Sequence, residues 1–408
     1  MSSDQTRDPE AAGRQGSPLE VLGAFLRLGL TSFGGPIAHL GYFRHELVVR
    51  RRWLDEAEYA DLVALCQFLP GPASSQVGFA LGLHRAGPLG ALAAWTGFTL
   101  PSAAAMFAFA YAAAALSGPF GLALVHGLKL VAVAIVAQAV LGMARTLAPD
   151  ARRSAIAVAA TAVLVLFGGG LAQIGAILLG GVAGLLLCRG QAGPQAGTLR
   201  FKVGRPAATI SFLLFFGLLL GGPALAAATG WRSLAVFDAF YRSGAPVFGG
   251  GHVVLPLLQA RVVDTGWTGA DTFLAGYGAA QAVPGPLFSF AAYLGAVLEP
   301  APNGLPGAMI ALAGIFLPGM LILVAVLPFW DSLRQVPTVQ AALRGTNAAV
   351  VGILAAALYD PIWISAIATP TDFAIALCGF VALVSWRAPP WSVVVGVVAV
   401  NLALTMAS

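Results

Sequence analysis

The chain has 408 residues, of which 58% are hydrophobic and only 10% are charged. A typical soluble domain carries about 25% charged residues, so this chain has too little charge to cover a water-facing surface. The net charge of +5 fits the excess of Lys and Arg that membrane proteins carry in their cytoplasmic loops, and we expect no nucleic acid as partner. The composition therefore predicts an all-α polytopic membrane protein that lies in a lipid bilayer.

Apolar segments follow one another along nearly the whole chain. Residues 1–16 are polar and lack an apolar signal region, so we expect a disordered cytoplasmic tail there. A transmembrane helix needs about 20 apolar residues to cross a hydrocarbon core of roughly 30 Å. Candidate segments cover 19–43, 59–83, 88–117, 120–147, 153–168, 170–188, 207–228, 234–260, 272–298, 303–328, 338–359, 362–384 and 388–406.

One motif occurs twice. FLRLGLTSFGG at 25–35 and FYRSGAPVFGG at 240–250 share the pattern F-x-R-x-G-x-x-x-F-G-G, 215 positions apart. Four further anchors recur in the same order: Trp53 as Trp267, QFLPGP at 67–72 as QAVPGP at 281–286, FTLPS around Pro101 as IFLPG around Pro318, and HGLKLVAVAIV from His126 as RGTNAAVVGIL from Arg344. Five anchors in one order predict an internal duplication.

The duplication sets the domain organisation. We expect an N-terminal transmembrane repeat over residues 17–188 and a C-terminal one over 232–408. Residues 189–231 would join them through a basic cytoplasmic linker and one connecting transmembrane helix.

The basic clusters indicate the orientation of the two repeats. Three stretches rich in Arg should be cytoplasmic, namely 44–53, 144–153 and 188–206. Residues 168–170 would then lie outside, and both ends of 59–83 would lie inside, so that this segment enters the membrane and returns as a hairpin. Because 207–228 crosses once, the second repeat would be inverted. Two inverted-topology repeats with re-entrant, broken helices are a common plan among secondary transporters. If 59–83 crossed once instead, the first repeat would be reversed.

The two Pro-Gly-Pro sequences break their helices, because proline removes a donor and glycine permits unusual backbone angles. A new half-helix begins after each break, and others begin after the Gly-Gly pairs. The first N–H groups of such a half-helix are unpaired and carry the positive end of its dipole, so they favour anions. We expect side-chain donors from Ser74, Ser75, Gln76 and Ser289.

Three cations lie within apolar segments, where a charge costs about 2.5 kcal/mol or more. Arg27 and Arg242 precede the Gly-Gly breaks, and Lys129 lies in the middle of a long apolar helix. Their charge suits a tetrahedral oxyanion, which the planar fork of arginine binds at two points. The alternative is a structural ion pair, and Asp238 lies four residues before Arg242.

The sequence provides no residue set for an enzyme or a cofactor. Cys66, Cys188 and Cys378 are scattered without metal-ligand spacing, so we expect no metal and assign them as small core residues. His39 and His252 follow the Gly-Gly breaks; we weigh hydrogen-bonded core histidines against residues that titrate or bind substrate.

The duplicated motifs resemble those of the chromate ion transporter (CHR) family in its long, two-domain form. The resemblance rests on FGGP at 33–36, Arg44, Trp53 and QFLPGP at 67–72, with FGGGH at 248–252 and QAVPGP at 281–286 as counterparts. It implies that the family's conserved residues, in the substrate-binding region, are Gly34, Gly35, Pro36, Gln67, Pro70, Gly71 and Pro72, with Gly249, Gly250, Gln281, Pro284, Gly285 and Pro286 in the second repeat.

The resemblance implies a multi-pass inner-membrane protein that exports chromate and confers chromate resistance. One alternative is a transporter of sulfate, which has the same charge and shape, or of another oxyanion, with chromate as a mimic. Another is a membrane enzyme or assembly subunit. The sequence leaves the coupling ion and the oligomeric state open, with a homodimer as one arrangement.

Overall fold

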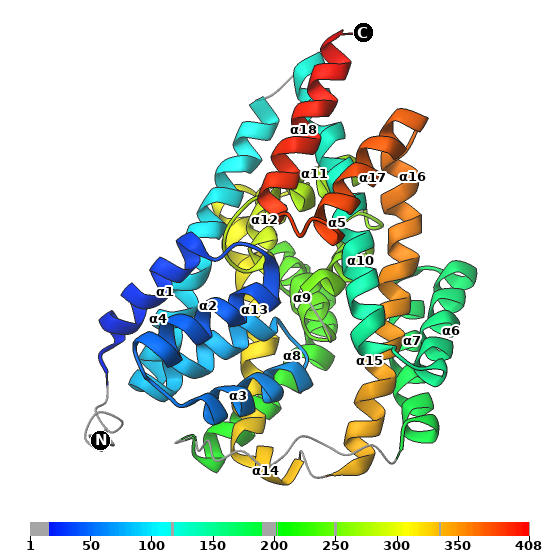
Figure 1. Ribbon diagram of the computed structural model, residues 1–408. Helices are drawn as coiled ribbons and strands as arrows, with labels where there is room; N and C mark the ends of the chain where they lie inside the picture. Colours follow the sequence, from blue (N-terminus) through cyan, green and yellow to red (C-terminus); the bar gives the residue numbers. More distant parts are fainter. Residues whose placement is uncertain are drawn as a thin grey trace, which may run out of the picture.

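The computed structural model describes residues 16–115, 118–189, 201, 203–248, 251–333 and 336–407, and these fold as helices without any strand (Figure 1). The expected tail, apart from Gly16, and Gly249 and Gly250 lie outside the described residues. The first half contains α1 (Pro18–Thr31), α2 (Gly35–Phe43), the π-helical η2 (Arg44–Arg50), α3 (Glu56–Phe68), α4 (Ala73–Ala115), α5 (Pro119–Leu147), α6 (Ala151–Phe167) and α7 (Gly169–Leu187).

The connecting helix α8 (Arg205–Thr229) leads into the second half of the chain. That half contains α9 (Arg232–Gly244), η3 (Gly251–Val253), α10 (Val254–Val262), α11 (Ala270–Ala280), η4 (Leu287–Ser289), α12 (Phe290–Val297), α13 (Gly304–Val326), η5 (Leu327–Phe329), α14 (Trp330–Leu333), α15 (Pro337–Ala357), η6 (Leu358–Trp363), α16 (Ile364–Ala366), α17 (Pro370–Val384) and α18 (Pro390–Ala407).

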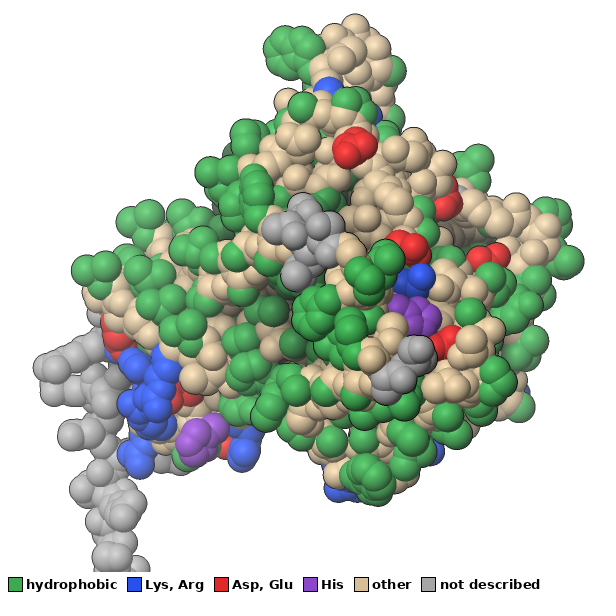
Figure 2. All heavy atoms as spheres, turned by 90° about the horizontal axis from the view of Figure 1, so that it is seen from above, with side chains coloured by type: hydrophobic (Ala, Val, Ile, Leu, Met, Phe, Trp, Pro, Cys, Tyr) green, Lys and Arg blue, Asp and Glu red, His purple; other side chains and the backbone are tan. Residues whose placement is uncertain are grey.

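Within the described part of the chain, five helical stretches are long and apolar enough to cross a membrane. They are Ala73–Ala113, Pro119–Leu147, Arg205–Thr229, Gly304–Phe329 and Pro337–Ala366. Seen from above, the rim of the molecule consists mainly of hydrophobic side chains, and charged side chains gather in a few places (Figure 2). Large side chains such as Leu122, Phe167 and Leu220 are exposed, as lipid-facing residues of a membrane protein are.

The equivalent long helices of the two halves run in opposite directions. In Figure 1, α5 descends from the top of the view, whereas its counterpart α15 rises from the bottom. The last helix, α18, ends at the top of the view. The predicted fold, two inverted repeats of transmembrane helices, is confirmed.

The expected hairpin over 59–83 is formed by α3 and the first segment of α4. Glu20, near the start of α1, accepts hydrogen bonds from the Trp53 indole N–H and the Arg85 guanidinium, both at 3.2 Å. Trp53 precedes α3, and Arg85 lies just before a break in α4 at Ala86 and Gly87. The outer ends of α3 and of this segment therefore meet at α1, and the Pro-Gly-Pro turn forms the opposite tip.

Helices α6 and α7 are shorter than the five long apolar stretches. We expected two full crossings with residues 168–170 outside. A helix of 17 residues such as α6 is only about 25 Å long, less than a hydrocarbon core of roughly 30 Å. The turn between α6 and α7 lies beside Ala356 and Asp360. Both residues come before the C-terminal end of the long helical stretch Pro337–Ala366, which includes α15. The two full crossings stay a prediction. With or without them the chain returns to the side from which it came, so the orientation of later helices is the same.

Each terminal hairpin packs on the long helix of the other half. Helices α6 and α7 lie along α15, and α17 and α18 lie along α5 (Figure 1). Glycines permit the close approach: a Cβ atom on Gly345 of α15 would meet the backbone of Gly180 and Gly184 of α7.

Cys378 does not lie in the core. Cys66 and Cys188 are buried as expected, but Cys378 on α17 is exposed. A lipid-facing position is as apolar as a core position, so the apolar sequence around Cys378 did not separate the two.

The packing of each terminal hairpin on the long helix of the other half predicts that substitutions of two glycines differ in their effect on stability. We expect Gly345→Leu to lower the thermal unfolding temperature of the detergent-solubilised protein markedly, because the side chain collides with the α7 backbone. Gly221→Leu on α8, where a Cβ meets nothing within 4 Å, should change it little. Equal effects of the two substitutions would contradict the packing of α15 against α7.

Candidate functional site

The broken helices of the two halves are joined by two reciprocal backbone hydrogen bonds. The N–H of Gly71 donates to the carbonyl of Val247 at 2.7 Å, and the N–H of Gly285 donates to the carbonyl of Ser32 at 2.9 Å. Each bond links the Pro-Gly-Pro turn of one half to the segment before Gly-Gly in the other. The predicted breaks, including Pro70, Pro72, Pro284 and Pro286, therefore meet where the two halves meet.

The start of the first-half half-helix is a closed polar cluster. The side-chain amide of Gln76 donates to the carbonyls of Pro70 and Gly319, each at 2.9 Å. The hydroxyl of Ser74 lies 3.3 Å from Nδ1 of His39. Ser74, Ser75 and Gln76 are all buried, as is Ser289 in the second half. The hydroxyl of Ser75 has no hydrogen-bond partner among the described residues.

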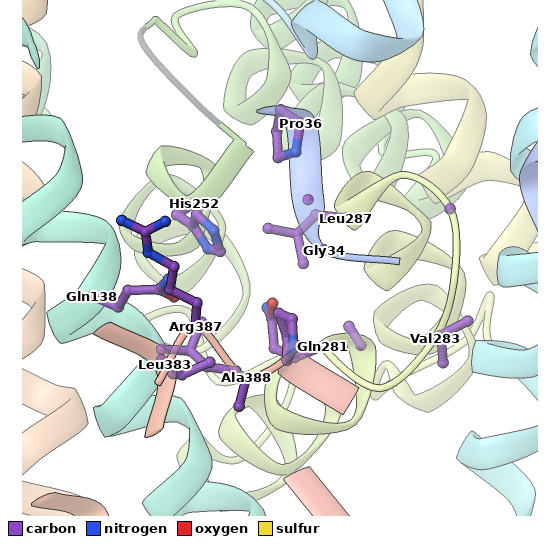
Figure 3. A pocket seen from close by; sticks show the side chains of 15 residues that line it. Gly34, Pro36, Gln138, His252, Gln281, Val283, Leu287, Leu383, Arg387 and Ala388 are labelled. Atoms are coloured by element: carbon purple, nitrogen blue, oxygen red, sulfur yellow. The ribbon is translucent and has the colours of Figure 1, made fainter. Parts of the chain in front are cut away.

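A cavity of about 280 Å³ opens beside these turns (Figure 3). Both halves of the chain contribute to it, as do the long helix α5 and the connection between α17 and α18. Its lining consists of Gly34, Gly35, Pro36, Ile135, Gln138, His252, Ala280, Gln281, Val283, Gly285, Leu287, Leu383, Arg387, Ala388 and Pro390. Gly34, Gly35, Pro36, Gln281 and Gly285 are predicted site residues that the structure brings together here.

The polar groups of the cavity suit an anion. Its lining contains Arg387 and no Asp or Glu. Gln281 lines this cavity, and its Nε2 atom is buried without a hydrogen-bond partner among the described residues. Helix α2 begins at this wall with Gly34 as its N-cap and no side-chain cap, which leaves the positive end of its dipole available. The hydroxyl of Tyr277 lies 2.6 Å from Nδ1 of His252, within hydrogen-bond distance.

A second cavity, of about 310 Å³, has the opposite charge. It lies at the turn between α6 and α7, next to α10 and α15. Its lining contains Asp264 and Asp360 and no Lys or Arg. Carboxylates repel an oxyanion, so of these two cavities the first is the one suited to an oxyanion.

The three predicted cations do not line the first cavity. Arg27 is exposed on α1. The guanidinium of Arg242 lies 4.0 Å from the carboxylate of Asp238, the ion pair considered as the alternative. Nζ of Lys129 lies 2.8 Å from the carboxylate of Asp271. For these three residues a role in substrate binding stays a prediction, and for two of them the contacts favour a structural ion pair.

Two lining residues, Gln138 and Arg387, were missed by the sequence analysis. Gln138 is one amide in the long apolar stretch that forms α5, and Arg387 lies in the polar break SWRAPP between two apolar segments. The break marked a loop, and nothing in the sequence placed that loop next to the Gly-Gly turn. Gln67, in contrast, is exposed at the end of α3.

Comparison with known proteins gives a consistent result. A sequence model of the family described as "Chromate transporter" matches residues 19–185 and again residues 234–402. The chain is 29% identical over 341 residues to the "Probable chromate transport protein" of Synechococcus elongatus, and the match covers 82% of each chain. It is 28% identical to the "Chromate transport protein" of Cupriavidus metallidurans, with 88% of this chain and 87% of the relative covered. No solved structure matches the chain.

The Lys129–Asp271 pair predicts a charge-swap rescue. Lys129→Glu places two carboxylates together and should destabilise the protein by about 1–3 kcal/mol. Adding Asp271→Lys should restore both the thermal unfolding temperature and anion transport. If the double variant regained stability but not transport, Lys129 would contact the substrate and not only Asp271.

Proposed function

Because this chain belongs to the chromate transporter family, we propose that it is a secondary transporter that exports chromate across the inner membrane and so confers chromate resistance. The family consists of membrane transport proteins, so the chain is a transporter and not an enzyme. The observation that carries the proposal is the cavity between the two inverted halves, which offers hydrogen-bond donors and a cation but no carboxylate.

The geometry supports binding at the turns of the broken helices. Chromate is a tetrahedral dianion, and the amide of Gln281 and the N-terminus of α2 would replace part of its hydration shell. Two reciprocal backbone hydrogen bonds link the halves at this level, and the cavity lies beside them. Rocking of one half against the other would open the site to one side of the membrane at a time.

The membrane potential favours export of a dianion. An inside-negative potential contributes about 2.3 kcal/mol per charge per 100 mV. This gain drives efflux of a dianion without a coupled ion, so we propose potential-driven export as the basic mode.

Sulfate is the second candidate substrate. It shares the charge and the tetrahedral shape of chromate, and the donors that line the cavity are directed at oxygen atoms and not at the central atom. The competing proposal is therefore a sulfate or general oxyanion transporter for which chromate is a mimic.

Flux measurements test the function. Purified protein in liposomes should carry chromate in response to an imposed potential, and sulfate should compete. Gln281→Ala should raise the KM for chromate about tenfold through the lost hydrogen bond to a charged ligand. Thr209→Ala, exposed on α8 and bonded only to its own helix, is the control.

Three outcomes would change the proposal. Absence of flux with either anion would overturn the transport function. Flux with sulfate alone would favour the second candidate. In right-side-out and inside-out vesicles, chromate movement only toward the cytoplasm would contradict export.

A further inference from the structure

Arg387 is the one Lys or Arg among the residues that line the anion-compatible cavity. It lies in the short connection between α17 and α18, and in Figure 3 its side chain extends between Gln138 and His252. No described residue forms an ion pair or a hydrogen bond with its guanidinium. The side chain of Arg387 is exposed where it borders the cavity. The guanidinium is therefore available to a ligand.

The backbone of Arg387 has a conformation that suits glycine. Its φ is +53°, in the left-handed region that L-residues other than Asn and Asp seldom adopt. The equivalent hairpin turn of the first half uses Gly168 and Gly169, with φ of +62° and +72°. Arg52 also has a φ of +52°, at an exposed site, so the angle alone assigns no role. What distinguishes Arg387 is its place at the cavity.

The charges of the two cavities show where an anion can bind. The cavity next to the α6–α7 turn contains two aspartates, and the one next to the α17–α18 turn contains Arg387. These two turns belong to equivalent hairpins of the two halves. The structural duplication is thus retained while the charge of the two sites is reversed.

We propose that Arg387 is the cationic ligand of the transported oxyanion, an inference that rests on the proposed function. Its planar fork pairs with two oxygens of a tetrahedral anion. Gln281 Nε2 supplies a donor from the facing wall, and the N-terminus of α2 supplies another. In the tautomer in which Nδ1 of His252 accepts from the Tyr277 hydroxyl, the ring proton lies on Nε2, which is then a further donor. The α17–α18 turn thereby holds the substrate against the turns of both halves.

The left-handed backbone makes an unusually clean test feasible. Arg387→Gly and Arg387→Asn remove the charge and introduce residues that suit a φ of +53°, so the fold should be as stable as before or more so. Arg387→Lys keeps a positive charge without the fork. Arg52→Gly is the matched control, because it removes an exposed arginine with nearly the same φ outside the cavity.

The probe is sulfate, which binds without redox chemistry. Its affinity is measured by titration calorimetry in a phosphate-free maltoside detergent, so that no lipid phosphate competes for the guanidinium. We expect the Gly and Asn variants to bind sulfate about tenfold or more weakly, at an unchanged or higher unfolding temperature. The Lys variant should recover part of the affinity, and Arg52→Gly all of it. In the Gly and Asn variants, the affinity for perchlorate, a tetrahedral monoanion, should fall less than the affinity for sulfate.

Two results separate failure of this inference from failure of the function. If wild-type protein binds sulfate and carries chromate but Arg387→Gly does both equally well, the role of Arg387 is overturned and the transport function stands. If wild-type protein neither binds nor carries either anion, both proposals fall. If the arginine affects anion binding only after phospholipid is added, its ligand is a lipid phosphate and the inference is wrong.

Discussion

The structure depends on how the broken helices satisfy their backbone groups. Inside a membrane an unpaired N–H or C=O costs several kcal/mol, and no water is present to pair with it in the hydrocarbon. The chain meets this constraint by exchange: Gly71 bonds to Val247, and Gly285 bonds to Ser32. Each half therefore completes the broken helix of the other. These bonds lie at the interface between the halves, and the cavity lies next to them.

The two halves share a backbone frame but differ in the charges of their side chains, which agrees with our proposal of one anion site. The reciprocal bonds and the glycine contacts occur in both halves, so the backbone retains the symmetry. The side-chain charges do not retain this symmetry. Lys129 pairs with Asp271, whereas Asn347, the counterpart of Lys129 in the second half, is neutral. The two hairpin cavities likewise differ, with aspartates in one and Arg387 in the other. The duplicated backbone is therefore compatible with a cation beside one cavity and carboxylates beside the other.

The sequence was informative wherever backbone chemistry decided the structure. Proline and glycine have specific local consequences, so the positions of the breaks, the hairpin of α3 and the inverted duplication could all be predicted. Helix length and partner choice were harder. The apolar pattern of α6 and α7 is the same for a full crossing and for a short hairpin, and it does not reveal which neighbour covers the helix.

The side chains of the site were the least predictable part. The contact of Lys129 with Asp271 could not be predicted, because Asp271 lies 142 positions away in the sequence. The place of Arg387 beside the cavity could not be predicted either, because segments from both halves form that cavity. In both cases the surroundings of a charge depend on distant residues that local sequence does not identify.

The exchanged packing of the terminal hairpins has a consequence for biogenesis. The hairpin of α6 and α7 leaves the ribosome long before α15, the helix whose glycine face it covers. During synthesis its small residues must remain in contact with lipid or with the insertion machinery until the later helix arrives. The first half of the chain therefore reaches its final structure only when the second half is in the membrane, and the order of synthesis is not the order of assembly.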